Sequence, residues 1–559
     1  MKMAVRSVYR AGNVALLLAV GAAACDGGDP GPMSGQQVLD GRDFGELFFW
    51  QPRTLAFTRD TADKSQPEPQ DFLVWPLDEA QPSVALSGID WTYPDRWPAW
   101  LVGDLLLTGK QYERVYDVGN RQAMDVFQML SWTPPAGEQP QLYELLETTA
   151  MRSDGRAFGK IIDGTTVVVG RPSELGTFPV AEGTTVGAIA FAGSDLVMLV
   201  RQKTADLDLV NIQRLNTASG ALTELVPATT AADWARVTGF CDDTQPPSSC
   251  GFFGTFGCTV DEPPCPDGQP PPCLIFYAKL DPSDPTKKAA YVFDMGAGTS
   301  TKLDGVDPDR FVTNRRDHLF VWGSGVGSYT NYWNTCSGVR GSCETWPGPG
   351  FTWRPDGGAF AMYGAQQSMR IVNVADGTCS APDPQKTFSI YQAQYSPGSD
   401  RLWWVAANDA HETSFNLWLA DPNGDAPVSI ATDTDLGATF SRDGQRIFIS
   451  HNGESSAALG WADVNASPPV EHVLSANRGD IGVLGNRRAM FLDHWNVQDG
   501  NGELVLVDLD TGARQSLARA VTGVAVAGSN EDAGTDVAYA VRGRAASSRD
   551  GLWLTTLPP

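Results

Sequence analysis

Three stretches of the chain repeat one pattern. They are Phe351-Thr-Trp-Arg-Pro-Asp-Gly-Gly-Ala-Phe-Ala-Met-Tyr363, Gln394-Tyr-Ser-Pro-Gly-Ser-Asp-Arg-Leu-Trp-Trp-Val-Ala406 and Thr439-Phe-Ser-Arg-Asp-Gly-Gln-Arg-Ile-Phe-Ile-Ser450. Each joins two apolar runs through a turn rich in Pro, Asp, Gly or Ser. Equivalent turn residues, Pro355, Pro397 and Arg442, lie 42 and 45 residues apart. A period in the forties with several short strands per period is typical of β-propeller blades.

The same period extends through the C-terminal half and more irregularly through the N-terminal half. Apolar residues alternate or cluster in runs that are too short for helices. We therefore predict an all-β protein, a β-propeller of four-stranded antiparallel blades with about 8 to 11 repeat units. The predicted first strands start near Gly45, Trp91, Thr148, Thr185, Ala235, Phe311, Phe351, Ala393, Ala438, Gly482 and Val524.

The number of rings is left open by the repeat alone. Single propellers usually have about four to eight blades, so eleven units favour two tandem propellers, in residues 44–305 and 306–559. The alternative is one ring of about 7 to 8 blades. The last unit ends after its third strand, and an N-terminal strand such as Glu46-Leu-Phe-Phe-Trp50 would complete it.

Two of the turns resemble a known repeat family. Phe440-Ser-Arg-Asp-Gly444 and Arg354-Pro-Asp-Gly357 are similar to the turn of the TolB-type, WD-like β-propeller repeat. The resemblance extends over about 310–557 and implies a propeller there. The TolB family also has an α/β domain ahead of its propeller, and no helical period precedes this one. The family's role in the cell-envelope Tol complex is therefore not carried over.

The N-terminus has the pattern of an export signal. Lys2, Arg6 and Arg10 precede the apolar run Val14–Val20, which is too short to span a bilayer. Ala22-Ala-Ala-Cys25 follows and resembles the cleavage box of bacterial lipoproteins, with Ala22 in place of the usual Leu. The resemblance implies lipidation of Cys25, a signal peptide over 1–25 and an envelope anchor in the outer or inner membrane. Ordinary cleavage after Ala24 is the alternative. Residues 26–43 are predicted to form a flexible tether.

Nine cysteines are present, and lipidation of one leaves an even number for disulfides, as expected in an exported protein. Five of these eight lie in a Pro-rich insertion, 241–273, which we interpret as a stapled surface loop or a recognition surface. We predict that Cys336 and Cys343 close a hairpin and that Cys379 pairs with a cysteine of the insertion. The disulfide candidates are Cys241, Cys250, Cys258, Cys265, Cys273, Cys336, Cys343 and Cys379.

Composition excludes some partners. The 559-residue chain has a formal net charge of -25 and no basic run, so its surface repels nucleic acid and anionic headgroups. Neither a Gly-x-Ser-x-Gly elbow nor a His-Glu-x-x-His motif occurs. The cysteine spacings include no Cys-x2-Cys pair, which argues against a zinc site.

One set of side chains suggests a ligand site. In a four-stranded meander, the loops after the second strands share one face, and three successive loops carry a histidine with acids beside it. These groups would bind a divalent metal or a polar ligand if they converged near the pore. The alternative is solvated loop histidines that lie too far apart to share an ion. The candidates are His411, Glu412, His451, Glu454, Asp493 and His494.

These features together predict a lipid-anchored, non-enzymatic binding or scaffold protein of the bacterial envelope. Its expected partners are envelope proteins or glycans, and it would contact the membrane only through the anchor. We expect a monomer that binds no nucleic acid. We expect no cofactor other than a divalent metal at the histidine and acid site. The alternative function is a metal-dependent propeller hydrolase or lyase that uses the histidine and acid face.

Overall fold

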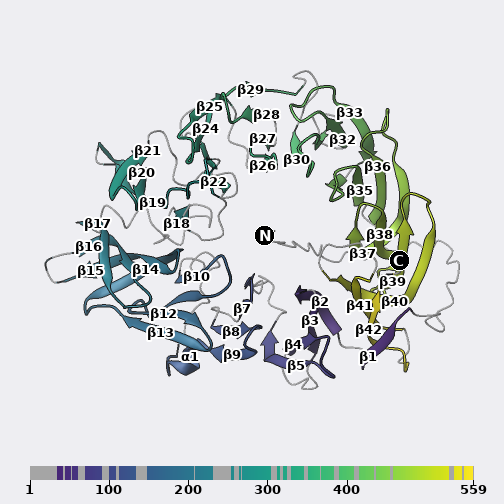
Figure 1. The fold of residues 1–559 in the computed structure, drawn as a ribbon, viewed down its shortest axis with the longest axis horizontal. Helices are drawn as coiled ribbons and strands as arrows, with labels where there is room; N and C mark the ends of the chain where they lie inside the picture. Colours follow the sequence, from purple (N-terminus) through teal and green to yellow (C-terminus); the bar gives the residue numbers. More distant parts are fainter. Residues whose placement is uncertain are drawn as a thin grey trace.

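The structure is a computed structural model of the chain (Figure 1). It describes residues 34–557 except 42–43, 52, 61–68, 91–99, 109–112, 134–147, 205, 207, 231–253, 257, 259–263, 266, 282, 304–310, 315–318, 324–328, 345–349, 365–366, 383–388, 408–414, 434–435, 453–456, 528–533 and 544–546.

Eight sheets of four antiparallel strands follow one another along the chain, and each is one blade. Blade 1 comprises β2 (Phe44–Gln51), β3 (Thr54–Asp60), β4 (Pro69–Pro76) and β5 (Ser83–Asp90). Blade 2 comprises β6 (Trp100–Val102), β7 (Leu105–Thr108), β8 (Arg114–Asp117) and β9 (Gln122–Asp125), followed by the short helix α1 (Val126–Met129). Blade 3 comprises β10 (Thr149–Met151), β11 (Phe158–Ile162), β12 (Thr166–Arg171) and β13 (Glu174–Pro179). Blade 4 comprises β14 (Thr184–Ala192), β15 (Asp195–Lys203), β16 (Asp208–Leu215) and β17 (Leu222–Thr230).

The next four blades continue this order. Blade 5 comprises β18 (Gly254–Phe256), β19 (Leu274–Asp281), β20 (Asp284–Asp294) and β21 (Thr299–Leu303). Blade 6 comprises β22 (Phe311–Asn314), β23 (Leu319–Gly323), β24 (Tyr329–Asn334) and β25 (Arg340–Glu344). Blade 7 comprises β26 (Gly350–Trp353), β27 (Ala359–Gly364), β28 (Gln367–Asn373) and β29 (Cys379–Ser380). Blade 8 comprises β30 (Ile390–Tyr395), β31 (Leu402–Ala407), β32 (Phe415–Ala420) and β33 (Val428–Asp433).

The last three blades are joined in one ten-stranded sheet, because two strands of 13 residues each serve two blades. Blade 9 comprises β34 (Leu436–Phe440), β35 (Arg446–Asn452), β36 (Ala457–Asp463) and the first half of β37 (His472–Leu484). Blade 10 comprises the second half of β37, β38 (Arg488–Asn496), β39 (Asn501–Asp508) and the first half of β40 (Arg514–Val526). Blade 11 comprises the second half of β40, β41 (Asp536–Val541), β42 (Gly551–Thr556) and β1 (Gln36–Asp40).

The repeated turn between the first and second strands is stabilised by contacts within the turn itself. In the turn between β26 and β27, the Asp356 carboxylate accepts a hydrogen bond from the Gly358 backbone N–H at 2.8 Å. Gly357 has φ 72° and Gly444, at the equivalent place in blade 9, has φ 73°. This left-handed conformation is strained for residues with a Cβ atom, so the Asp-Gly pair selects the turn.

Buried apolar side chains lie between blades. One cluster joins Trp403 and Val405 of blade 8 to Ile447 and Ile449 of blade 9. The second and third strands supply most of it, and every second residue faces this cluster because side chains alternate between the two faces of a sheet. A cluster of this kind joins each blade to the next, from blades 1 and 2 to blades 10 and 11.

The eleven blades form a single closed ring (Figure 1). A further cluster packs Leu55 and Phe57 of blade 1 against Ala538 and Leu552 of blade 11. This differs from the two tandem propellers that the unit count favoured, with their boundary at 305. The reason is physical: blades 5 and 6, on either side of that boundary, share a buried cluster that includes stacked Phe276 and Phe320 rings, so the ring does not divide there.

The ring is closed by an N-terminal strand, as the alternative prediction required, but by a different one. Strand β1 pairs with β42 in antiparallel register, with Gln36 opposite Leu554 and Asp40 opposite Gly551. Residues 46–50, which were expected to close the ring, lie in β2 as the first strand of blade 1. The predicted tether 26–43 therefore contains a strand of the fold, since the third strand of blade 11 leaves an edge that β1 covers.

Three disulfides lie in the described residues: Cys258–Cys273, Cys265–Cys336 and Cys343–Cys379. The predicted Cys336–Cys343 bridge is wrong. Cys343 lies in β25 opposite Thr330, whereas Cys336 lies in the turn after β24, so the two are displaced along the hairpin. Cys379 consequently pairs within blades 6 and 7 rather than with the insertion.

The insertion 241–273 was expected to contain no strand. Its described part includes β18, which pairs with β19 as the first strand of blade 5. Cys241 and Cys250 lie outside the described residues, as does Cys25. In the part of the chain that the structure describes, no helix has the length and apolar character needed to cross a membrane.

Candidate functional site

The two faces of the ring differ in the connections they carry. We call the face with the turns between first and second strands, and between third and fourth strands, the turn face. The other face, the loop face, carries the connections from second to third strands and from one blade to the next. Connection lengths vary on both faces: residues 103–104 and 257–273 connect first to second strands on the turn face, and residues 163–165 and 542–550 connect second to third strands on the loop face.

Turns of neighbouring blades are bonded to one another on the turn face. The Trp50 indole N–H donates to the Gly103 carbonyl at 2.8 Å, from blade 1 to blade 2. The backbone N–H of Asp356 donates to Ser399 Oγ at 3.1 Å, and that of Asp443 donates to Asn486 Oδ1 at 2.9 Å. The repeated turn residues therefore build the ring as well as the blade.

His451 lies near the end of β35, toward the loop face. Its backbone pairs with Leu436 on one side and Ala458 on the other. Its Nε2 is 2.7 Å from Glu471 Oε1, and the side chains of both residues are less than a quarter exposed. This acid partner was not among the predicted ones, and it fixes the orientation of the imidazole.

His494 lies near the end of β38, in the equivalent place one blade further. Its φ is 51°, uncommon for a residue with a side chain, and its side chain is 74% exposed. The Nδ1 atom is 3.7 Å from Asp493 Oδ2 and 3.5 Å from Glu503 Oε2. His494 is therefore the accessible histidine of this pair.

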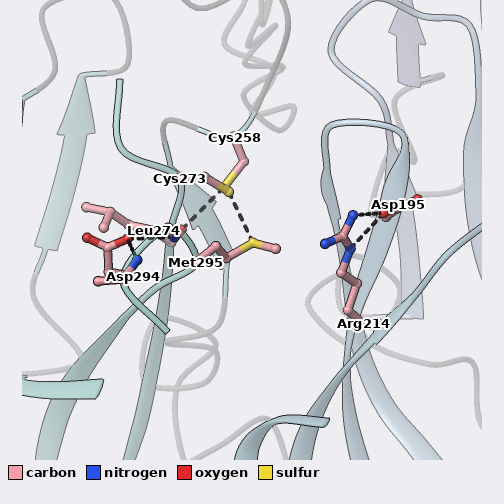
Figure 2. The surroundings of a disulfide bond; sticks show 9 residues. Asp195, Arg214, Cys258, Cys273, Leu274, Asp294 and Met295 are labelled. Atoms are coloured by element: carbon pink, nitrogen blue, oxygen red, sulfur yellow. Dashed lines mark hydrogen bonds and ion pairs between the residues drawn. A yellow bond between two sulfur atoms is a disulfide. The ribbon is translucent and has the colours of Figure 1, made fainter. Parts of the chain in front are cut away.

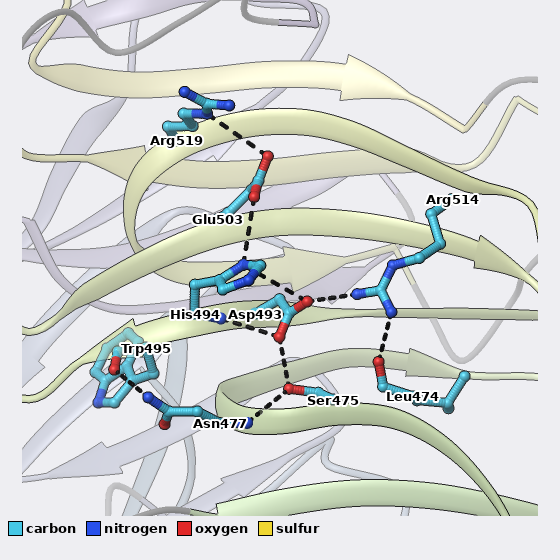
Figure 3. Close-up of polar contacts among 9 residues, drawn as sticks. All are labelled: Leu474, Ser475, Asn477, Asp493, His494, Trp495, Glu503, Arg514 and Arg519. Carbon is cyan, nitrogen blue, oxygen red and sulfur yellow. Dashed lines mark hydrogen bonds and ion pairs between the residues drawn. The ribbon is translucent and has the colours of Figure 1, made fainter. Parts of the chain in front are cut away.

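Asp493 is buried and is the centre of a hydrogen-bond network (Figure 3). The Ser475 hydroxyl donates to its Oδ1 at 2.6 Å, and the His494 backbone N–H donates to the same atom at 3.0 Å. The Arg514 guanidinium pairs with Oδ2 and also donates to the Leu474 carbonyl at 2.7 Å. Both carboxylate oxygens are thus satisfied, which stabilises a buried charge.

This network connects the two shared strands. Ser475 lies in the first half of β37, Asp493 in β38 and Arg514 at the start of β40. Sequence reasoning selected Asp493 but missed the other two, because they are 18 and 21 residues away. The sequence carried no signal for these contacts, because β40 is not adjacent to β38 in the sheet and Ser475 pairs with β36.

His411, Glu412 and Glu454 lie outside the described residues. Within the described ranges, no group of three or more His, Cys, Asp or Glu side chains has a geometry suited to a metal ion. Convergence of the three histidines stays a prediction.

Lys160 of β11 is a buried cation that sequence reasoning did not select. It is 2% exposed, donates to Thr149 Oγ1 at 3.3 Å and lies 5.6 Å from the centre of the Phe127 ring. Burial lowers the pKa of its amine to about 8, against an opposing effect of Glu113. The amine lies beside the apolar cluster that joins blades 2 and 3, so Lys160 places a positive charge in the interface between these two blades.

The disulfides lie in blades 5 to 7 and their connections. Cys258–Cys273 lies beside Met295, with the Cys273 and Met295 sulfurs 3.2 Å apart (Figure 2). Cys265–Cys336 joins the segment before β19 to the turn after β24, and Cys343–Cys379 joins the outer strands of blades 6 and 7. Three consecutive blades are therefore linked covalently.

The strand order and the ring closure define a β-propeller. No protein-family model matches the chain, and no curated protein matches it. Similar solved structures include the tricorn protease, at 11% identity and a TM-score of 0.26, with 93% of this chain covered. This chain spans 58% of the tricorn protease chain.

Two smaller proteins are also similar. TolB from Acinetobacter baumannii is 12% identical with a TM-score of 0.23, and the match covers 58% of this chain and 81% of TolB. An oligogalacturonate lyase from Vibrio parahaemolyticus is 9% identical with a TM-score of 0.29, over 70% of this chain and 90% of the lyase.

Proposed function

We propose that the protein is an exported, lipid-anchored binding scaffold of the bacterial cell envelope. The observation that carries the proposal is the set of three disulfides across blades 5 to 7. Structural disulfides persist in oxidising compartments, which agrees with the export signal that the sequence predicts before Cys25. The lipidation of Cys25 is inferred from the sequence.

The fold supports a binding role in two ways. Eleven apolar interfaces close the ring, so the loops project from a rigid frame, and loops on rigid scaffolds are common binding surfaces. The acidic chain, with its formal charge of -25, would select against nucleic acid, and the proposed envelope location makes envelope proteins or glycans the expected partners. An anchor would raise the effective concentration of the ring for partners in the same membrane.

The first test concerns the anchor. Mass spectrometry of the mature N-terminal peptide should show a diacylated Cys25, and Cys25→Ser should move the protein from the membrane fraction to the soluble fraction. An unmodified mature N-terminus in wild-type cells would remove the anchor from the proposal.

The second test concerns binding. Cross-linking in intact cells, followed by purification from membranes, should recover a defined envelope protein or glycan with the wild type. Cys25→Ser should reduce that yield because the soluble ring loses its local concentration. Equal recovery of the partner by both proteins would contradict the role of the anchor.

A further inference from the structure

The position of β1 sets where the N-terminal segment enters the ring. Strand β1 is the outermost strand of blade 11 and runs antiparallel to β42. Gly551 begins β42 after the loop-face connection 542–550, and it pairs with Asp40. Gln36 pairs with Leu554, toward the other end of β42, so β1 begins at the turn face.

Further contacts place Ser34 toward the same face. Its backbone N–H donates to the Leu517 carbonyl at 2.8 Å, near the start of β40, and its carbonyl accepts from the Tyr539 hydroxyl. Just after the end of β42, the Leu557 carbonyl accepts a hydrogen bond from the Gly534 backbone N–H, in the turn before β41, at 2.9 Å. At its opposite end β1 reaches the loop face, where Gly41 donates to the Asp550 carbonyl.

The tether between the anchor and the ring is short. Cys25 precedes Ser34 by nine residues, which reach at most about 30 Å when fully extended. An eight-residue strand such as β39 spans about 27 Å from one face toward the other. The tether is therefore comparable to the thickness of the ring and restricts which face approaches the lipid.

From this placement we infer that the turn face of the ring is held toward the membrane and the loop face is presented to partners. The inference rests on the proposed anchor at Cys25. The turn face carries exposed carboxylates in successive blades, at Asp376, Asp425 and Asp463, whereas Asp510 in the next blade is paired with Arg446 and Arg487. Anionic headgroups repel these charges over about 8 Å at physiological salt, so the ring stands off the lipid instead of lying flat on it.

The loop face then points away from the membrane. It exposes Val497 and His494, whose exposed fractions are 72% and 74%. Envelope proteins and glycans would reach this face, while the turn face is occupied in holding neighbouring blades together.

Two positions at opposite ends of β39 test the orientation. Ala513 is exposed on the turn face of blade 10, and Val497 is exposed on its loop face. Each is replaced separately by p-azidophenylalanine and coupled to a donor dye. Residues 1–25 are replaced by a decahistidine tag that binds nickel-chelating lipid in phosphatidylcholine vesicles containing a membrane acceptor dye. We expect transfer from Ala513 to be at least twofold more efficient than transfer from Val497.

Equal transfer from both positions, or stronger transfer from Val497, would overturn the inference. In a control protein, the tag is inserted in the connection 542–550 and therefore attaches the loop face to the vesicle. Transfer from Val497 should then be more efficient than transfer from Ala513. Because the histidine tag replaces the native anchor, this result is independent of lipidation. An unmodified Cys25 in cells would count against the proposed function alone.

Discussion

Blades 5 to 7 and blades 9 to 11 hold their neighbours by different means. The first group is joined by disulfides, two of which connect one blade to the next. The second group has no disulfide in its described residues and is joined by the backbone, because β37 and β40 each pass from one blade to the next. The outer strands differ accordingly: β29 has two residues, whereas β37 and β40 have 13 each.

A blade with a short outer strand lacks a backbone connection by ladder hydrogen bonds to the next blade. In blade 9 and blade 10 the outer strand continues into the next blade, so ladder hydrogen bonds and buried side chains cross the boundary together. In blade 7 only Cys379 and Ser380 pair with β28. The Cys343–Cys379 disulfide links this short outer strand to β25 of blade 6 and so limits the separation of blades 6 and 7.

The largest expected effect is the loss of the long-range disulfide. Its two cysteines are 71 residues apart, against 15 for Cys258–Cys273. In the chain-entropy model, Cys265→Ser/Cys336→Ser should cost about 4 kcal/mol of unfolding free energy. Cys258→Ser/Cys273→Ser should cost about 1 kcal/mol less than that. Urea denaturation of both double variants, followed by fluorescence, measures the difference, and equal losses would contradict a role in restraining the blades.

Substitution of Lys160 tests the interface between blades 2 and 3, which has neither a disulfide nor a shared strand in the part that the structure describes. Its pKa is lowered to about 8 in the fold from 10.5, so the unfolded chain binds more protons between these values. Stability from this group therefore rises as pH increases from 8 to 10.5, and the full cost of the buried charge applies below pH 8. Lys160→Met should remove that cost, about 3 kcal/mol as an upper value, at pH 7.

The measurement is the difference in unfolding free energy between wild type and Lys160→Met from pH 7 to pH 10. The difference should shrink at high pH because the wild-type amine becomes neutral in the fold. Lys203→Met, at an exposed position, is the matched control and should show no such trend. A difference that is constant with pH would contradict the assignment.

Breaking the Asp493 network should loosen the shared strands. Arg514→Met removes one of the partners of a buried carboxylate, while Ser475 and the His494 N–H remain, so we expect a loss of about 2 kcal/mol. Hydrogen exchange should increase in β37, β38 and β40 more than in blades 5 to 7. The double variant Asp493→Asn/Arg514→Met should lose less than the sum of the single variants, and strict additivity would exclude direct coupling.

The smallest effect is expected at His494. Its φ of 51° favours glycine, so His494→Gly should match or exceed the stability of His494→Ala by a few tenths of a kcal/mol up to about 1 kcal/mol. Thermal unfolding of the two variants makes this comparison without altering Asp493. A clear preference for alanine would show that the side chain, rather than the backbone, determines the conformation at this position.

The sequence alone identified most of the blades, whereas the predicted starts Trp91 and Ala235 lie outside the described residues. The predicted starts at Gly45, Thr185, Phe311, Phe351 and Ala393 lie in or at the first strands of their blades, and Ala438, Gly482 and Val524 do so as well. These patterns are local: alternating apolar residues specify a strand, and an Asp-Gly pair specifies the turn that follows. The predicted range of about 8 to 11 units includes the observed number, but two rings were favoured, and the single-ring alternative had 7 to 8 blades and was closed by residues 46–50 rather than by β1.

Only the tertiary structure decided how the blades assemble and which side chains meet. One ring rather than two depends on contacts between Leu55 and Ala538, nearly the whole chain apart, and the period contains no information about the angle between neighbouring blades. The pairing of Cys343 with Cys379, and of Ser475 and Arg514 with Asp493, depends on strand register in the same way. A repeating pattern determines the unit through short-range preferences, whereas ring size and cross-strand partners follow from packing between units.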